Sequence, residues 1–202
     1  VTRSAYLRCT FGAKQKTLGN VAPMSDNEML GDGSSSSPIE PEDSLLEAFW
    51  TRAKNVAKIN PLEVIVGLDS VSALRPAAYS LGDSPEDADR LCQLVVEGAK
   101  RATSSWVASY QAENAPLPQV GELAIICDGS GAPHALARTA EVRRISFHEA
   151  GPEIAEAEGE GPFETWKAEH RAFFKRECQE LGIDFNENGE IIVEFFEVLY
   201  KH

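Results

Sequence analysis

Two stretches in the first half of the chain carry apolar residues at helical spacing. In the first, Ser44 is a good N-cap, and apolar residues recur every three or four positions up to Val56. In the second, Ser84 caps the start, Asp87 adds the acid of a capping box, and the apolar stripe ends near Gly98. The pattern predicts two amphipathic helices, beginning near residues 44 and 84.

Strand-like runs dominate the second half. Turn residues separate four of them, at about 102–109, 123–127, 135–145 and 191–200. Residues 60–78, between the two helices, read as an irregular connection. Because the strands are segregated from a few helices, the pattern predicts an α+β fold rather than an alternating α/β one.

A third helix is expected between the last two runs. It follows an acidic stretch, 153–164, which we expect to be a solvated loop. Its apolar face would contain Trp166, Phe173 and Cys178. His170 lies on that aromatic face, where a hydrogen-bonded structural histidine is favoured over a catalytic one.

Residues 1–43 are expected to be a disordered tail without catalytic residues. They have few periodic apolar positions, and residues 31–38 are rich in Gly and Ser. Residues 1–23 contain basic residues and no acid, which suggests that translation starts naturally at Met24; a short targeting peptide is the rival hypothesis. Residues 44–202 are then one folded domain, with its core at about 79–200.

Composition and charge argue against two classes of partner, nucleic-acid backbones and membranes. Of 202 residues, 43% are hydrophobic, and the formal net charge is −13. This charge argues against wrapping a nucleic-acid backbone, so no DNA partner is expected, although a small pocket reading one nucleotide is compatible with it. No apolar run reaches the roughly 18 residues that span a bilayer, so no membrane partner is expected.

Four scattered cysteines, without CxxC or metal-like spacing, predict reduced thiols, a cytoplasmic location and no metal site. No nucleotide-binding fingerprint is present, so no cofactor is expected.

The segment after the second helix carries the candidate chemistry. Gly98 ends the helix, and Lys100 and Thr103 follow as a GxKxxT motif. A partly desolvated lysine has a lowered pKa and can act as a base for a nearby hydroxyl. Taken alone, the motif is weak, and a solvated lysine beside a strand threonine is the favoured explanation.

Further short segments of the chain support a functional role for this motif, because together they resemble one domain family in the same order. They are Gly82-Asp83-Ser84 before a helix, Leu94 to Thr103, Leu117 to Glu122, Phe147-His-Glu149, Ala155 to Gly161, Trp166, His170, Phe173-Phe174, Phe185 and Val193-Glu-Phe195. Together, residues 79–200 resemble the ASCH domain family of the PUA-like superfamily. The resemblance implies a β-barrel with flanking helices and a cleft that holds the GxKxxT segment and binds RNA or a nucleoside.

In a related branch of that family, small amidohydrolases remove the acetyl group of N4-acetylcytidine with a Lys, a Thr and a Glu. The resemblance places these at Lys100, Thr103 and Glu158, with Thr103 as nucleophile, Lys100 as its base, and Glu158 as orienter or acid for the leaving amine. The remaining substrate-binding candidates are Gly98, Arg101, Trp106, Asp83 and Glu160.

The chain departs from the compact amidohydrolases in its extra helices, as in a larger subfamily, and Arg138 stands where that subfamily suggests an acid. Three functions therefore stay open. An amidohydrolase acting on a small nucleoside-like ligand predicts convergence of Lys100, Thr103 and Glu158 around a closed cavity. A module that binds or cuts single-stranded RNA predicts a basic groove. A non-catalytic sensor predicts binding that is indifferent to Thr103.

Overall fold

The computed structural model describes residues 39–59 and 75–202. The predicted tail and the Met24 hypothesis lie almost wholly outside the described residues. Within them, no helix is both long enough and apolar enough to cross a membrane. Three cysteines there are buried free thiols, namely Cys92, Cys127 and Cys178.

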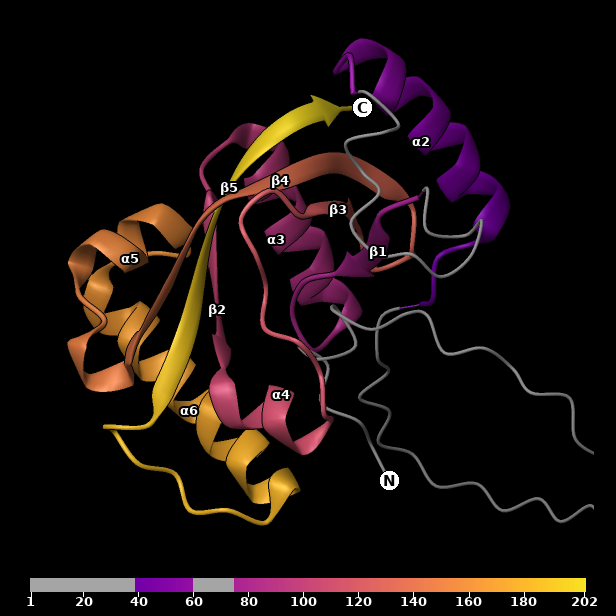
Figure 1. The fold of residues 1–202 in the computed structure, drawn as a ribbon. Helices are drawn as coiled ribbons and strands as arrows, with labels where there is room; N and C mark the ends of the chain where they lie inside the picture. The colour runs from indigo at the N-terminus through magenta and orange to yellow at the C-terminus, as the bar shows by residue number, and fades with distance from the viewer. Residues whose placement is uncertain (1–38, 60–74) are drawn as a thin grey trace, which may run out of the picture.

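A single curved sheet forms the centre of the fold. Its strands lie in the order β1 (Ala77–Ser80), β3 (Leu123–Cys127), β4 (Pro133–Ser146), β5 (Glu190–Lys201) and β2 (Ala102–Trp106). Strands β1 and β3 are parallel, and the other neighbours are antiparallel. Pairing of the long strands β4 and β5 shifts register twice, and bulges of this kind bend a sheet. The sheet accordingly curls into a half-barrel (Figure 1).

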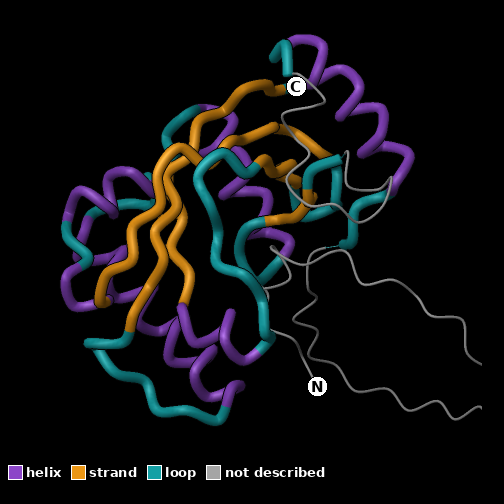
Figure 2. The backbone as a smooth tube through the Cα atoms, in the orientation of Figure 1, coloured by secondary structure: helices purple, strands orange, loops and turns teal. Residues whose placement is uncertain are grey.

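Helices cover both sides of this sheet (Figure 2). They are α2 (Asp43–Val56), α3 (Pro85–Glu97), α4 (Val107–Ala112), α5 (Pro152–Glu158) and α6 (Phe163–Leu181), with a short 3-10 helix η2 at Phe147–Glu149. The largest cluster of buried apolar residues joins β2 and β5 to α5 and α6, and includes Ala102, Val193, Ile154, Trp166 and Phe174. Helix α3 packs on β3 and β4 in a second cluster, and α2 packs on them in a third.

The ends of α3 follow from its sequence. Ser84 Oγ accepts a hydrogen bond from the Asp87 backbone N–H at 3.1 Å, as an N-cap does. Gly98 closes the helix at φ +82°, a left-handed conformation that favours glycine. The chain therefore turns sharply just before Lys100.

Three sequence-based expectations need correction. The strand expected at 102–109 ends at Trp106, and α4 begins at the next residue. Strand β1 begins at Ala77, inside the stretch expected to be irregular. The acidic stretch expected as a solvated loop contains α5, because Pro152 begins a helix whose Ile154, Ala155 and Ala157 pack inward, and Glu158 is fully buried.

Candidate functional site

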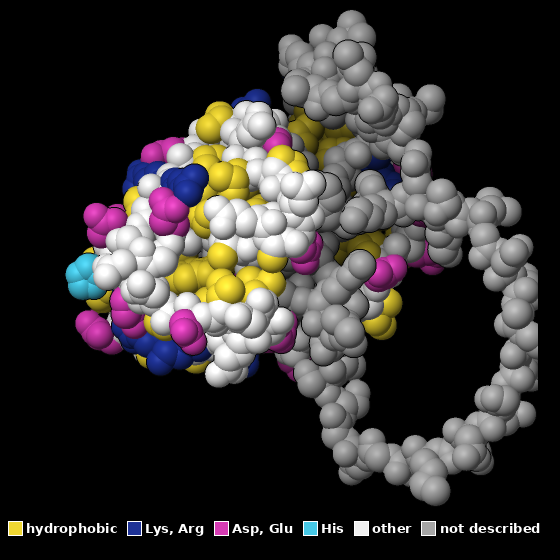
Figure 3. Space-filling model, turned by 60° about the horizontal axis from the view of Figure 1, so that its bottom comes forward, with side chains coloured by type: hydrophobic (Ala, Val, Ile, Leu, Met, Phe, Trp, Pro, Cys, Tyr) yellow, Lys and Arg dark blue, Asp and Glu magenta, His cyan; other side chains and the backbone are white. Residues whose placement is uncertain are grey.

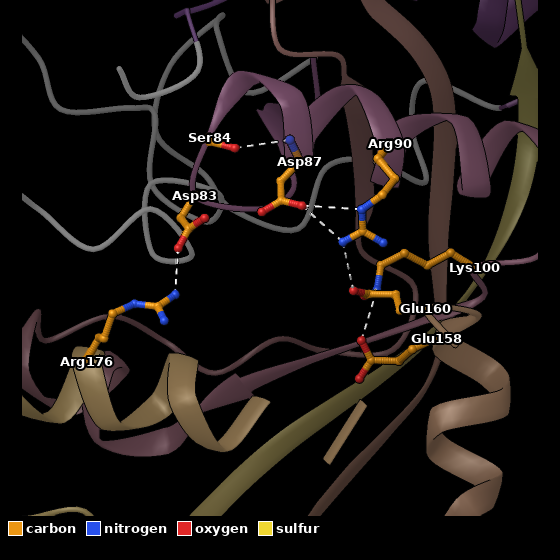
Figure 4. A network of polar contacts seen from close by, with 8 residues as sticks. All are labelled: Asp83, Ser84, Asp87, Arg90, Lys100, Glu158, Glu160 and Arg176. Atoms are coloured by element: carbon orange, nitrogen blue, oxygen red, sulfur yellow. Dashed lines mark hydrogen bonds and ion pairs between the residues drawn. The ribbon is translucent and has the colours of Figure 1, made fainter. Parts of the chain in front are cut away.

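Lys100 lies at the junction of α3 and β2. Its backbone N–H donates to Leu94 O at 3.0 Å, which fixes the residue against the end of α3. The side chain is fully buried, and Nζ lies 2.9 Å from Glu158 Oε2 and 2.5 Å from Glu160 Oε1. Two carboxylates nearly 60 residues further along the chain therefore hold one buried ammonium (Figure 4).

A close approach of backbones brings these carboxylates to Lys100. Helix α5 ends at Gly159, at φ +68°, and a Cβ there would lie 2.5 Å from Ala99 O. The Arg101 N–H also donates to Ala157 O at 2.7 Å. Only glycine fits both the conformation and the contact. The sequence Glu158-Gly159-Glu160 is thus docked directly on the segment that carries Lys100.

Further side chains complete a charged cluster, which we define as Lys100, Ser104, Glu158, Glu160 and His170. Ser104 Oγ donates to Glu158 Oε1 at 2.6 Å. His170 Nε2 lies 3.4 Å from Glu158 Oε2, and its ring stacks on Trp166 with ring centroids 4.3 Å apart. Contacts continue outward from Glu160 to Arg90 at 3.6 Å and on to Asp87, toward the surface (Figure 4).

Charges within this cluster compensate one another. Burial disfavours the ammonium of Lys100, but Glu158 and Glu160 outweigh it and raise the pKa of that lysine. The expected lowering of the pKa of Lys100 is therefore wrong in direction. Burial likewise disfavours the carboxylate of Glu158, but Lys100 and His170 lower its pKa below the usual range. At neutral pH the cluster is a buried ion pair, with Lys100 charged.

The opposite side of β2 carries a different set of groups. Because side chains alternate along a strand, Thr103 points away from Ser104 and the charged cluster. Thr103 is 8% exposed, and its Oγ1 has no hydrogen-bond partner among the described residues. Directly opposite Thr103 in the β2–β5 pairing is Glu194. Thr139 Oγ1, on β4, donates to Glu194 Oε2 at 3.2 Å. We call Thr103, Thr139 and Glu194 the Thr103 face.

Burial raises the pKa of two of the described acids, Glu122 and Glu194, and the shift is larger for Glu194. Burial raises its pKa to about 7; the hydrogen bond from Thr139 opposes the rise, and the charge of Glu122 adds to it. Among the described residues, the groups that shift this pKa include no cation, in contrast to those around Glu158. This carboxyl therefore changes charge near neutral pH.

Comparison with known families agrees with this architecture. The sequence model of the ASCH domain matches residues 77–200. The chain belongs to the ASCH domain family. An ASCH domain from Lactobacillus crispatus JV V101 is 26% identical, with a TM-score of 0.66 over 78% of this chain and 96% of that one. A protein from Enterococcus faecalis V583 is 32% identical, with a TM-score of 0.65 over 77% of this chain and 88% of that one. A search of curated proteins found no match.

The family resemblance located some site residues better than others. Lys100, Glu158 and Glu160 are brought together. Thr103 makes no hydrogen bond to Lys100 or Glu158, and Ser104 is the hydroxyl that Glu158 binds.

Among the expected binding residues of this ASCH domain, Gly98 caps α3 and Arg101 is exposed. Asp83 pairs with Arg176 at 2.8 Å, away from the charged cluster (Figure 4). Trp106 is buried between Phe174 and Phe185, with ring centroids 5.1 and 5.5 Å away. Trp106 is therefore packed in the core and is not available to a ligand as expected.

A metal is a poor fit for the charged cluster. Glu158, Glu160 and His170 offer ligand atoms that lie within 4.8 Å of one another. The ammonium of Lys100 already bonds both carboxylates, however, and supplies the positive charge that a cation would bring. Two surface hollows, of about 410 and 240 Å³, lie elsewhere, lined by residues such as Val95 and Val198 in one and Val107 and Ile183 in the other.

Ser104 and Glu194 are the polar residues that the sequence analysis missed. For Glu194 a signal existed, since it is the one acid within the apolar run from Ile191 to Phe196. An acid inside a strand that is buried on both faces needs a partner or a function.

Proposed function

We propose that this ASCH domain hydrolyses the amide bond of a small acylated nucleobase or nucleoside such as N4-acetylcytidine, with Thr103 as nucleophile. The observation that carries the proposal is the buried hydroxyl of Thr103, which has no partner in the described residues and lies on a strand whose other side is fixed by the buried Lys100, Glu158 and Glu160. Burying ions is costly and seldom improves stability over apolar packing, so a function better explains why the cluster is kept.

Lys100 serves in this proposal as a cation rather than a base, because its pKa is raised. An ammonium has three N–H donors, and two of those of Lys100 are directed to Glu158 and Glu160. The ion pair lies on the opposite side of β2 from Thr103 and fixes the strand that carries this nucleophile. Glu158 and Glu160 hold the ammonium in place, and Ser104 and His170 hold Glu158.

A small ligand agrees better than an RNA strand with the surface charges. Three exposed arginines are each paired with an acid: Arg138 with Glu197, Arg143 with Glu141, and Arg144 with Glu190. On the face shown in Figure 3, basic and acidic side chains are interspersed along one edge, beside a largely apolar and uncharged middle. Phosphate backbones bind where cations are clustered and unpaired.

Release of cytidine from N4-acetylcytidine by the purified chain tests the proposal. Thr103→Val is expected to lower kcat at least about 100-fold by removing the nucleophile. Lys100→Met breaks the ion pair on the opposite side of β2 and should lower kcat less, through the placement of that strand. Arg138→Met, which removes an exposed cation, serves as the matched control and should behave as wild type. Absence of turnover, together with salt-sensitive binding of a short single-stranded RNA, would replace the hydrolase proposal with the RNA-binding one.

A further inference from the structure

We propose that Glu194 is the general base that accepts the proton of Thr103 Oγ1, and hence a further catalytic residue of the ASCH site. This inference rests on the proposed function and deepens it, because a threonine nucleophile needs a base. The fixed charge of Lys100 leaves that role unfilled.

The sheet register places the two residues together. Thr103 on β2 pairs directly with Glu194 on β5. Opposed residues of an antiparallel pair have Cβ atoms about 4.5–5.5 Å apart on the same face. A change of side-chain rotamer in Glu194 therefore suffices to bring a carboxylate oxygen to Thr103 Oγ1. The buried hydroxyl of Thr103, without a partner in the described residues, is the second observation that marks this face as a site.

The surroundings of Glu194 suit a base. Thr139 Oγ1 donates to Oε2 and so orients the carboxyl. The negative charge of Glu122 raises the pKa of Glu194. The backbone oxygen of Glu122 accepts a hydrogen bond from the Thr139 N–H at 2.9 Å, so Glu122 lies beside strand β4. Burial raises the pKa of Glu194 to about 7, near the ideal for a base working at neutral pH.

The proposed reaction balances without a cofactor. Thr103 Oγ1 forms a bond to the acyl carbon while its proton passes to the Glu194 carboxylate. The C–N bond then breaks, and the proton held on Glu194 goes to the leaving amine. Water next attacks the acyl-threonine, giving its proton to Glu194, which returns a proton to Thr103 Oγ1 as the carboxylic acid leaves. The net reaction is amide plus water to acid plus amine.

The pH dependence of kcat separates a base from a merely structural residue. Because the base must be ionised, wild-type kcat should rise as pH passes through about 7 and level off above it. Thr139→Val removes a hydrogen bond that lowers the pKa of Glu194, so the rise should move to higher pH. Glu122→Gln removes a negative charge that raises the pKa of Glu194, so the rise of kcat should move to lower pH. Glu194→Gln should lower kcat at least about 100-fold with little change in KM, and Glu194→Asp should recover part of the loss.

The closing experiment uses p-nitrophenyl acetate, an activated acyl donor that does not depend on recognition of a nucleobase. Mass spectrometry should find an acetyl group on Thr103 of the full chain, formed at least about 10-fold more slowly in Glu194→Gln. Glu197→Gln on the same strand, an exposed acid, should react at the wild-type rate. If Thr103 is acetylated in this Glu194-dependent way but N4-acetylcytidine is not hydrolysed, the proposed substrate fails and the base assignment stands. If Thr103 is not acetylated, or is acetylated equally fast in Glu194→Gln, the base assignment is overturned.

Discussion

Buried carboxylates on the two sides of strand β2 have pKa values that are shifted in opposite directions. On the side facing α5 and α6, Glu158 is fully buried, yet Lys100 and Ser104 satisfy both of its oxygens. On the other side, Glu194 is less deeply buried, but its hydrogen bond from Thr139 is opposed by the charge of Glu122. Burial tends to raise the pKa of both acids; the pKa of Glu158 falls because cations surround it, whereas that of Glu194 rises.

This difference separates a carboxylate that positions its neighbours from one that can take part in proton transfer. A carboxylate whose charge is compensated by a fixed cation keeps one protonation state and positions its neighbours. A desolvated carboxyl without a cation changes protonation near neutral pH and can exchange protons with a substrate or nucleophile. In this ASCH domain the two kinds of acid lie on either side of the same five-residue strand.

Removing the cation should have the largest effect on stability. Lys100→Met leaves Glu158 and Glu160 buried without their ammonium, and we expect a loss of about 3–5 kcal/mol in the free energy of unfolding at pH 7. Urea unfolding followed by circular dichroism measures it. The loss should shrink at pH 4, where the carboxylates deprived of Lys100 become protonated. A loss below about 1 kcal/mol at pH 7 would contradict the view that Lys100 neutralises this cluster.

Neutralising Glu194 should raise the free energy of unfolding, whereas removing Lys100 lowers it. The pKa of Glu194 is raised from 4.5 to about 7, so its protonated form stabilises the fold below pH 4.5, and this contribution is lost as pH rises through 7. Glu194→Gln keeps a neutral group at every pH. The variant should match wild type near pH 4 and be more stable by on the order of 2 kcal/mol at pH 8, given about 1.4 kcal/mol per pKa unit and partial solvent screening. If the free energy of unfolding depends on pH equally in the variant and the wild type, burial does not raise the pKa of Glu194.

Local signals explain which parts of this comparison the sequence could predict. Helix α3 was predicted closely because Ser84 and Gly98 mark its ends through their own hydrogen bonding and φ preference. Lys100 was singled out by the glycine that ends the helix before it, whereas Glu158 and Glu160 were assigned through the family resemblance, since no pattern of spacing joins them to Lys100. Their mutual contacts depend on Gly159 docking against Ala99, which is a tertiary event.

The missed features share one physical cause. Val107 and Ala108 after Trp106 fit a strand as well as a helix, so the predicted strand extended to residue 109, whereas α4 begins at Val107. Glu194 reads as a simple interruption of an apolar strand, because its relation to Thr103 is set by the β2–β5 register. Register depends on long-range pairing rather than on local sequence.

The finest test compares two neighbouring hydroxyls on opposite sides of β2. Ser104→Ala removes the donor to Glu158 Oε1, a charged acceptor, and should destabilise the fold by roughly 1.5 kcal/mol. Thr103→Val keeps the shape of the side chain and removes a buried hydroxyl that has no partner in the described part of the chain, so stability should be unchanged or rise by up to about 1 kcal/mol. Activity should follow the reverse order, with Thr103→Val inactive and Ser104→Ala retaining turnover. Paired urea titrations and N4-acetylcytidine assays measure both properties, and a Ser104→Ala variant that is stable but inactive would transfer the nucleophile to the side of the charged cluster.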